Sequence, residues 1–554
     1  MMVDRDIHLA RALLVDGNTM LRSTTATQLR DAGVGQVSTA GRIRDARLML
    51  EQEHFDIVVC TREFEDSKES GQDLLDELRR ENLLPQSTVF LMVSNQVAYH
   101  QVVEAAEAAL DGLLVRPFTA ATLAQKLQEA RLRKRELADV LKALDAGETQ
   151  LAFAHAIKRF QAGLPFGTYC GRLAAELLIG MGRVDDARRL FEKLFERTQS
   201  TWALLGKARA ELGGGDKNAA SRTLTEVLKK DPQAADAHDL MGQILVERGD
   251  FNAALDQYLA AAKLTPGCLL RAQSAGSLAF FQGQRVSARL WLERTLAMGM
   301  QSKLFDELTL ILIAFLRFED KDIVGVATLH RQLRQLSGSS PESTRLRRLE
   351  AVAQVLSLAV SGNDAQSEQA LTLLSQQIGA DDFDLEAANL VLALWTRTRA
   401  AAAGSSDHLA VLEAVGMRFC TNRAVAEVLM AAAGRSEATD TVVRQCQGRV
   451  MELSESAMAK AMDGKAVLAL PELLAEAERT LNSKLLELVV LIAKRHQQTA
   501  PELEVLAAKA AAIQLRCGKA SGHIAGLQRN GGRSAGALQL RGKAAQEVKA
   551  ELLV

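Results

Sequence analysis

Two hydrophobic patterns divide the chain. In the first 130 residues, short apolar runs alternate with amphipathic stretches of about a dozen residues. The runs occupy Leu9–Val15, Ile57–Cys60, Val89–Val93 and Leu113–Val115. Because these runs lack polar alternation, they predict strands buried on both faces, as in a parallel sheet covered by helices. The alternation of strand and helix therefore predicts a doubly wound, flavodoxin-like α/β domain.

Beyond residue 130 the apolar positions follow a helical period, and a longer repeat is superimposed on it. The motif Gly-x-x-x-x-Ala recurs with successive starts 33, 34 and 34 residues apart, at Gly182–Ala187, Gly215–Ala220, Gly249–Ala254 and Gly283–Ala288. An apolar residue follows each alanine four positions later, at Phe191, Leu224, Tyr258 and Leu292. A helix–turn–helix unit of about 34 residues is typical of the tetratricopeptide repeat (TPR), and these units resemble that family. We therefore expect an all-α TPR-like solenoid after the α/β domain.

Composition and charge exclude several classes of protein. The 554 residues include only 8 Pro, 3 Trp and 3 Tyr, and 48% are hydrophobic, which argues against an all-β fold. The 67 basic and 68 acidic residues nearly cancel, so electrostatic capture of nucleic acid is not expected. Six widely spaced cysteines predict buried thiols, not disulfides or a zinc site.

The sequence also lacks the signals of export, membrane insertion and catalysis. The first residues have no signal-peptide pattern, and no apolar run approaches the roughly 18 residues of a membrane span. We therefore expect a cytoplasmic protein without membrane contact. No P-loop, HExxH, GxSxG or dinucleotide-binding glycine motif is present, so we expect no enzyme activity.

The predicted strands of the α/β domain end at polar residues, where such domains place their functional sites. These residues are Asp16, Thr61, Ser94 and Arg116. Residues 7–130 resemble the receiver domain of two-component response regulators. The matching segments are LLVDGNTMLR (Leu13–Arg22), FDIVVCT (Phe55–Thr61), SGQDLLDELR (Ser70–Arg79), LMVSN (Leu91–Asn95) and LVRPFTAATL (Leu114–Leu123).

The resemblance implies a pocket with two acidic residues that hold Mg²⁺, an Asp that accepts phosphate and a Lys that pairs with it. Here the acidic pair is reduced to Asp16, because Gly17 follows it, and Thr61 stands at the acceptor position. Arg116 replaces the Lys and keeps only its charge. We expect a pseudo-receiver that takes no phosphate, and Mg²⁺ bound through Asp16 only if the pocket is still active.

Other positions keep the receiver pattern or leave an alternative open. Ser94 matches the switch hydroxyl, and Pro117 matches the proline that follows a cis peptide bond. Counting back from Ser70 across the loop places Glu63, instead of Thr61, at the acceptor position. Glu63 would then supply a weak acceptor or a permanent mimic of the phosphorylated state.

Both resemblances imply surfaces that bind proteins. In receivers the fourth and fifth helices form a docking or dimerisation face, which here corresponds to residues 96–109 and 119–131. The TPR resemblance implies a concave groove for an extended or helical peptide. The candidate groove residues are Lys207, Asp239, Gln243, Gln273 and Ser277. Their mixed polarity does not define the class of peptide.

We expect five segments along the chain: the receiver at 1–130, a linker helix and atypical first repeat at 131–167, TPR units at 168–300, degenerate helical repeats at 301–516 and a Gly-rich, mildly basic tail at 517–554. Prolines at Pro341, Pro471 and Pro501 mark expected helix starts. The charged residues 131–136 are expected to form a solvated face of the linker helix.

These features predict a non-catalytic signalling adaptor of a two-component system, with one protein partner on the receiver and another in the TPR groove. A homodimer is possible through the receiver face. An active response regulator, with the TPR groove as its output, is the first alternative. A nucleic-acid-binding regulator that uses the basic tail is the second.

Overall fold

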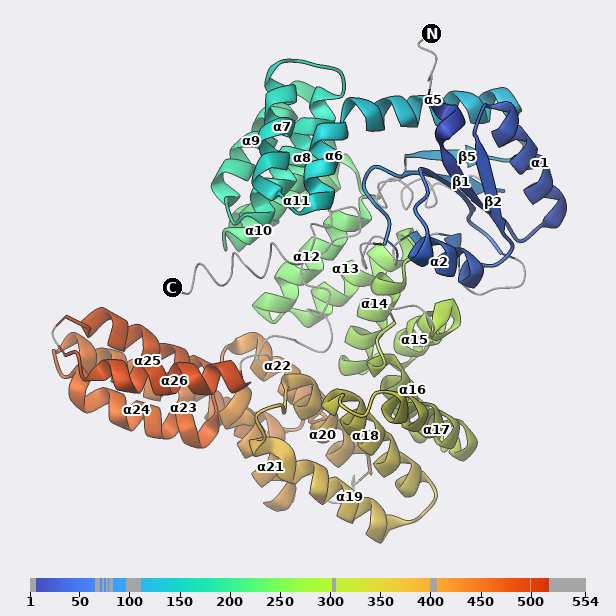
Figure 1. The fold of residues 1–554 in the computed structure, drawn as a ribbon. Helices are drawn as coiled ribbons and strands as arrows, with labels where there is room; N and C mark the ends of the chain where they lie inside the picture. The colour runs from blue at the N-terminus through green and yellow to red at the C-terminus, as the bar shows by residue number, and fades with distance from the viewer. Residues whose placement is uncertain are drawn as a thin grey trace.

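The structure, a computed structural model, describes residues 6–64, 70–71, 74–75, 78, 83–95, 111–300, 305–398, 406–498 and 500–517. An α/β domain is followed by a long array of helices, which confirms the predicted fold class (Figure 1). The predicted tail, apart from Cys517, lies outside the described residues. In the described part of the chain, no helix is long and apolar enough to cross a membrane.

The sheet of the N-terminal domain has five parallel strands in the order β2-β1-β3-β4-β5. The strands are β1 (Arg11–Val15), β2 (Gln36–Ala40), β3 (Ile57–Thr61), β4 (Val89–Ser94) and β5 (Gly112–Val115). β3 and β4 are buried along their whole length, as their unbroken apolar runs predict. The strand order reverses between β1 and β3, so the carboxyl ends of these strands border the crevice where such domains place their sites.

The sequence pattern missed one strand and misplaced the start of another. β2 is an edge strand in which only Ala40 is buried, so it contains no buried apolar run. Its pairing with β1 comes from the backbone, which hydrophobic patterning does not detect. Leu9 belongs to a short 3₁₀ helix (Ile7–Leu9) and is 71% exposed, so the first strand begins two residues later than predicted.

Helices cover both faces of this sheet. α1 (Thr19–Asp31) and α5 (Ala120–Glu136) pack against one face, with Leu29 and Leu127 in the same apolar cluster. α2 (Ile43–Gln52) covers the other face through Ala46. Residues 70–79, one of the segments that match the receiver family, are described only in part, and residues 96–110 lie outside the described residues.

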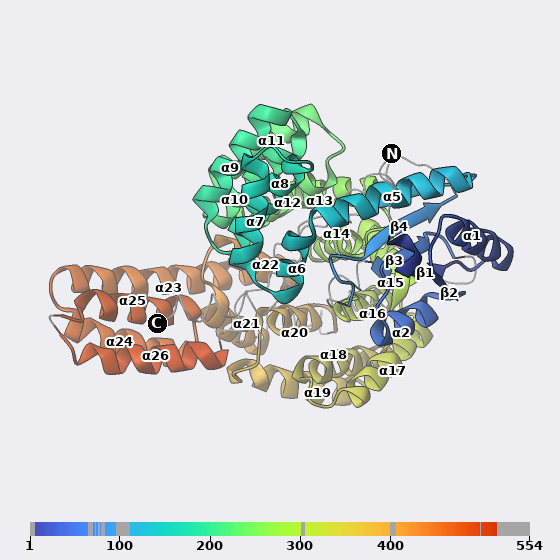
Figure 2. The same cartoon turned by 45° about the horizontal axis from the view of Figure 1, so that its top comes forward.

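The rest of the described chain consists of helices that pack on their neighbours in sequence. The first are α6 (Ala138–Ala146), α7 (Thr149–Gln161), α8 (Gly167–Gly180), α9 (Val184–Thr198), α10 (Thr201–Gly213), α11 (Lys217–Lys230), α12 (Ala235–Arg248), α13 (Phe251–Leu264), α14 (Leu269–Phe281) and α15 (Arg285–Gly299). Next come α16 (Leu308–Glu319), α17 (Ile323–Ser339), α18 (Thr344–Val360), α19 (Asp364–Gln376), α20 (Leu385–Thr398), α21 (Ser406–Phe419) and α22 (Arg423–Ala432). The last are α23 (Glu437–Met462), α24 (Ala466–Thr480), α25 (Ser483–His496) and α26 (Leu503–Cys517), which extend as a bundle beyond α21 and α22 (Figures 1 and 2).

The repeat motif has a direct structural basis. Gly182, Gly215, Gly249 and Gly283 each join two helices of a pair in the left-handed conformation, with φ of 73°, 81°, 80° and 70°. Residues with a Cβ rarely adopt this conformation, which explains why glycine recurs there. The four alanines of the motif are 0% exposed, at Ala187, Ala220, Ala254 and Ala288. The 34-residue period therefore arises because each unit needs a glycine in one tight turn and an alanine at one close contact between helices.

The junction between the α/β domain and the helical array differs from the prediction. Residues 131–136 were expected to form a solvated face, but part of this segment belongs to a network of polar contacts. The helix breaks at Leu137, between α5 and α6. Arg133 forms an ion pair with Asp111, whose side chain is 2% exposed, and Lys134 lies 3.2 Å from the same carboxylate. The Gln86 N–H, which precedes β4, donates to the Asp145 carboxylate of α6 at 2.9 Å. These contacts fix the first helical pair to the receiver domain.

Helices continue through the C-terminal half, and one predicted helix start is wrong. Pro341 and Pro501 lie just before α18 and α26, as expected. Pro471 instead lies in the second turn of α24, which begins five residues earlier. Proline there removes one hydrogen bond, to the Val467 carbonyl. Leu470 and its apolar neighbours on α24 are buried, and this packing offsets the loss.

A buried histidine makes the stability of this half depend on pH. His408 is 0% exposed and stacks on Trp395, with ring centroids 5.8 Å apart. Burial lowers the pKa of His408, so the folded chain holds the neutral ring. Because the unfolded chain then binds the proton more readily, the contribution of His408 is present above about pH 6.5 and is lost as the pH falls below it.

We expect the thermal unfolding midpoint of this half to fall between about pH 7 and pH 5, and to fall less in a His408→Asn variant. Calorimetry of both proteins at the two pH values measures the difference. An equal decrease in both proteins would contradict this role of His408.

Candidate functional site

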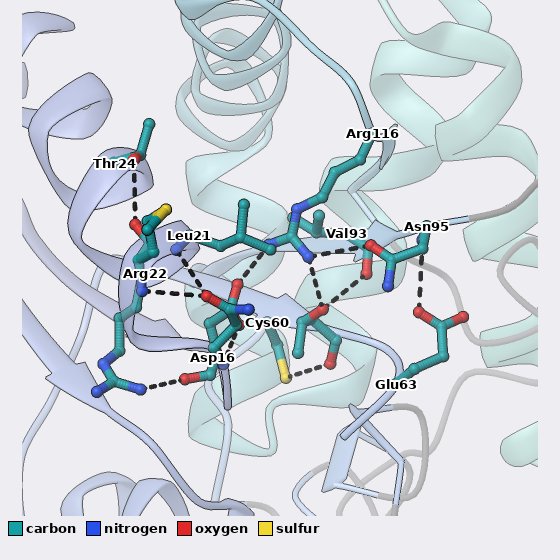
Figure 3. A network of polar contacts seen from close by, with 12 residues as sticks. Asp16, Leu21, Arg22, Thr24, Cys60, Glu63, Val93, Asn95 and Arg116 are labelled. Carbon is teal, nitrogen blue, oxygen red and sulfur yellow. Dashed lines mark hydrogen bonds and ion pairs between the residues drawn. The ribbon is translucent and has the colours of Figure 1, made fainter. Parts of the chain in front are cut away.

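The sheet brings four predicted residues together at the carboxyl ends of its strands. Two of them, Asp16 and Arg116, are in contact in Figure 3. Asp16 follows β1, Thr61 ends β3, Ser94 ends β4 and Arg116 follows β5. Parallel pairing places Val15 opposite Cys60 and Thr61 opposite Val93, so these ends lie at one edge of the sheet. Asp16 and Thr61 are each 2% exposed, and Ser94 is 0% exposed.

Arg116 is the centre of this site. Its Nη2 forms an ion pair with Asp16 Oδ2, while Nη1 donates to Thr61 Oγ1 at 3.4 Å and to Asn95 Oδ1 at 3.2 Å. The other Asp16 oxygen accepts the Asn18 N–H at 2.9 Å. Both carboxylate oxygens of Asp16 therefore already have protein donors.

Thr61 occupies the end of β3 with a hydroxyl where an active receiver has a carboxylate. Its Oγ1 accepts from Arg116 and donates to the Val93 carbonyl at 3.5 Å. A threonine hydroxyl is a weak nucleophile unless a base activates it, and Arg116 is a cation that cannot act as one. The neighbouring Cys60 thiol is also inert, because burial and the Asp16 charge raise its pKa.

Glu63, the competing acceptor candidate, has a different partner. Its carboxylate accepts the Ser94 hydroxyl at 3.0 Å and the Asn95 N–H at 3.4 Å. It lies beside Asn95 and away from Asp16 (Figure 3). The structure therefore separates the two candidates: Thr61 contacts the arginine, whereas Glu63 contacts the predicted switch hydroxyl.

The described residues at this edge do not fit an Mg²⁺ site. A Cβ on Gly17 would lie 3.3 Å from the Phe64 ring, so an aromatic side chain occupies the space beside the missing second carboxylate. Asp16 is paired with Arg116, and Thr61 brings no charge. Mg²⁺ requires several oxygen ligands in near-octahedral geometry. Among the described residues, no group of three or more His, Cys, Asp or Glu side chains could hold a metal.

Sequence reasoning missed three residues of the site. Arg22 donates from Nη1 to the Asp16 carbonyl at 2.5 Å, and Asn95 accepts from Arg116. Phe64 fills the space beside Gly17. Asn95 directly follows Ser94, so the sequence could have indicated that Asn95 lies at a strand end. The contact of the Arg22 side chain with the Asp16 carbonyl, from within α1, has no such indication in the sequence. The Arg116–Pro117 peptide bond, directly after β5, is cis, as expected.

The predicted TPR groove residues are mostly engaged within the chain. Lys207 of α10 pairs with Glu192 at 3.1 Å, and Gln243 of α12 donates to Glu247 at 3.3 Å. Asp239 of α12 pairs with Arg271 of α14 at 2.7 Å. Burial is the largest influence on Asp239 and raises the pKa of its carboxyl group. Of the five candidates, Lys207, Asp239 and Gln243 keep partial exposure.

Gln273 and Ser277 correct the prediction of an open groove along all the units. They are 6% and 7% exposed, on a helix, α14, that is buried on nearly every side. α22, from the C-terminal half, contacts both α12 and α14, and Ala424 of α22 lies against the turn at Gly249. The 34-residue pattern does not contain this contact, because it joins segments about 170 residues apart.

The predicted receiver docking face is described in one half. Residues 96–109 lie outside the described residues. In α5, Leu123, Leu127 and Ala130 are buried, while Gln125 and Lys126 are exposed on the outer side. The described part of this face is therefore polar.

A five-stranded parallel sheet in the order 2-1-3-4-5, with polar residues at its carboxyl edge, defines a doubly wound α/β domain of the flavodoxin-like class. Residues 12–128 match the response regulator receiver domain family, and residues 178–244 match the tetratricopeptide repeat family. Over its N-terminal domain, the chain belongs to the response regulator receiver family.

Two relatives support this assignment. The chain is 34% identical over 119 residues to chemotaxis protein CheY-3 of Vibrio cholerae, which covers 22% of this chain and 89% of that protein. It is 32% identical over 119 residues to chemotaxis protein CheY of Pseudomonas aeruginosa, and the match covers 22% of this chain and 94% of that protein.

Two solved structures also match the N-terminal domain. Vibrio cholerae CheY4 has 26% identity and a TM-score of 0.20, and the match covers 22% of this chain and 98% of that chain. A receiver domain protein from Clostridium thermocellum has 21% identity and a TM-score of 0.21, covering 23% and 98%.

Proposed function

We propose that this protein is a non-catalytic adaptor of a two-component signalling system. Its receiver domain takes no phosphate and docks a signalling protein, while its helical repeats bind a second protein. One observation carries the proposal: Arg116 bridges Asp16 and Thr61, so protein contacts use the charge that a phosphoryl group would require. The chain contains the receiver and TPR domains that such an adaptor needs.

In this proposal the receiver is held in one signalling state. The resemblance to receivers assigns Ser94 as the hydroxyl that responds to phosphate. Here Ser94 donates to the Glu63 carboxylate at 3.0 Å, so a permanent negative group takes the place of a transient one. The signal that the domain transmits is then constant, and regulation comes from the abundance of the protein or of its partners.

The first helical repeats provide the surface for the second protein partner. The N-terminal end of the concave face, on α8 and α10, retains partly exposed cations at Arg172 and Lys207. Farther along, α22 contacts α12 and α14, which leaves the first units as the binding surface for a peptide. We place the protein in the cytoplasm, with protein partners and no nucleic acid, and a homodimer through the receiver face remains compatible with this role.

Affinity capture with the full chain tests this function. We expect the same proteins to be recovered with and without acetyl phosphate and Mg²⁺, because the receiver state does not depend on phosphate. A Lys207→Glu variant should lose the partner of the repeats, whereas Lys494→Glu, on an exposed position of α25, should retain it. Capture that changes with acetyl phosphate would support the alternative of an active response regulator.

A further inference from the structure

A pocket of about 220 Å³ lies where the terminal bundle meets the preceding helices, far in the sequence from the receiver site. Its apolar lining includes Leu385, Phe419, Val425 and Leu486, from α20, α21, α22 and α25. Arg418, at the end of α21, lines the same pocket. Figures 1 and 2 both show α21 and α22 at the base of the bundle α23–α26.

Arg418 is a buried cation that forms no ion pair with a carboxylate among the described residues, and Asp381 and Asp382 act on its charge only from farther away. It is 4% exposed, its Nη1 donates to the Ile378 carbonyl, and its guanidinium lies 5.2 Å from the Phe419 ring centroid. The nearby carboxylates have other partners: Asp382 pairs with Arg348 at 3.1 Å, and Asp381 pairs with Arg516 at 3.7 Å. Burying a charge is costly unless it is paired, so an anion in the pocket would gain from Arg418.

The wall of the pocket at the start of α25 is held in a defined shape. Asn482 is 0% exposed, donates from Nδ2 to the Met417 carbonyl at 2.8 Å and caps α25 through Oδ1. The preceding residue, Leu481, lines the pocket with φ of 54°, a conformation that residues with a Cβ rarely adopt. A buried side chain therefore ties the start of α25 to the end of α21, the helix that carries Arg418.

We propose that this pocket binds a small monocarboxylate with an apolar body. Arginine pairs with a carboxylate through two parallel N–H donors, and the apolar walls would cover the rest of the ligand. The exposed Glu487 at the rim disfavours dianions such as phosphate. The pocket is smaller than the roughly 300–1,000 Å³ of sites for drug-sized ligands, so the ligand has about ten non-hydrogen atoms.

Titration calorimetry on the full chain tests the proposal with benzoate, with neutral benzamide of the same shape and with inorganic phosphate. We expect saturable binding of benzoate with Kd of about 1 mM or lower, and binding of benzamide and phosphate at least about ten-fold weaker. Arg418→Gln should weaken benzoate binding at least about ten-fold. Arg444→Gln, on an exposed position of α23, is the matched control and should bind as the wild type does.

Since Arg418→Gln can disturb folding, Ser483→Phe provides a second test. Ser483 lines the pocket from the partly exposed start of α25, and the larger side chain should fill the pocket and abolish binding. Lack of saturable benzoate binding to the wild type would overturn the proposal. Equal affinity for benzoate and benzamide, stronger binding of phosphate, or full binding by the Ser483→Phe variant would overturn it as well.

Discussion

Replacement of Arg116 by alanine is expected to lower the free energy of unfolding of the receiver domain by about 3–5 kcal/mol. The Asp16 side chain is 3% exposed and forms its ion pair with Arg116. Without the guanidinium, a buried negative charge is left with the Asn18 N–H as donor. The loss also releases Thr61 and Asn95, which Arg116 contacts on its other nitrogen. A buried charge that loses its partner costs far more than the pair contributes when intact.

Hydrogen exchange of the β1 and β3 amides, measured in the full chain, reports this change directly. Adding Asp16→Asn to the alanine variant should recover part of the stability, because it removes the unpaired charge. Arg11→Ala is the matched control in the same domain, since Arg11 and Glu53 form a pair that is 38% and 48% exposed. That change should cost no more than about 1 kcal/mol. Equal effects of the two alanine variants would contradict the buried ion pair.

Gly206→Ala is expected to destabilise the first repeats by about 2–3 kcal/mol or more. A Cβ at this position would lie 2.2 Å from a ring carbon of Phe191, which is 0% exposed. The ring cannot move without disturbing the packing between α9 and α10. In a helix without this contact, the same change would stabilise the chain, because alanine is a better helix former.

Gly448 offers that comparison within the same protein. It lies on α23, where a Cβ would have no side chain or neighbouring helix within 4 Å, so Gly448→Ala should stabilise the chain by up to about 1 kcal/mol. Phe191→Leu should reduce the cost of Gly206→Ala, since the smaller side chain leaves room for the methyl group. Urea unfolding of the four variants measures these differences. Additive effects of the changes at Phe191 and Gly206 would contradict the close contact.

The general fold could be predicted because both the sheet and the helical repeats require particular residue types at short, regular spacings. Buried parallel strands such as β3 require continuous apolar runs, and each repeat turn requires a glycine with positive φ, as at Gly249. Strand β2 was not predicted, because an edge strand pairs through its backbone and can leave polar side chains exposed. The sequence pattern also placed Thr61 and Arg116 at the strand ends that the sheet brings together.

The partners of the site residues could not be predicted in the same way. Nothing in the spacing of Glu63 and Ser94 indicates that these side chains meet, because the contact depends on the conformation of the loop after β3. The burial of Gln273 and Ser277 depends on how a long array curves, which a 34-residue period does not determine. Likewise, Lys134 is indistinguishable from a solvated lysine until Asp111 is placed beside it.

The intact mass of the full chain after incubation with acetyl phosphate and Mg²⁺ shows whether this receiver takes phosphate. A Gly17→Asp, Thr61→Asp and Arg116→Lys triple variant supplies the residues of an active receiver and serves as the positive control, while Glu63→Gln tests the competing acceptor. We predict an unchanged mass for the wild-type chain. Stoichiometric addition of one phosphoryl group to the wild type, removable with hydroxylamine, would show that the receiver is active and would rule out the phosphate-independent adaptor.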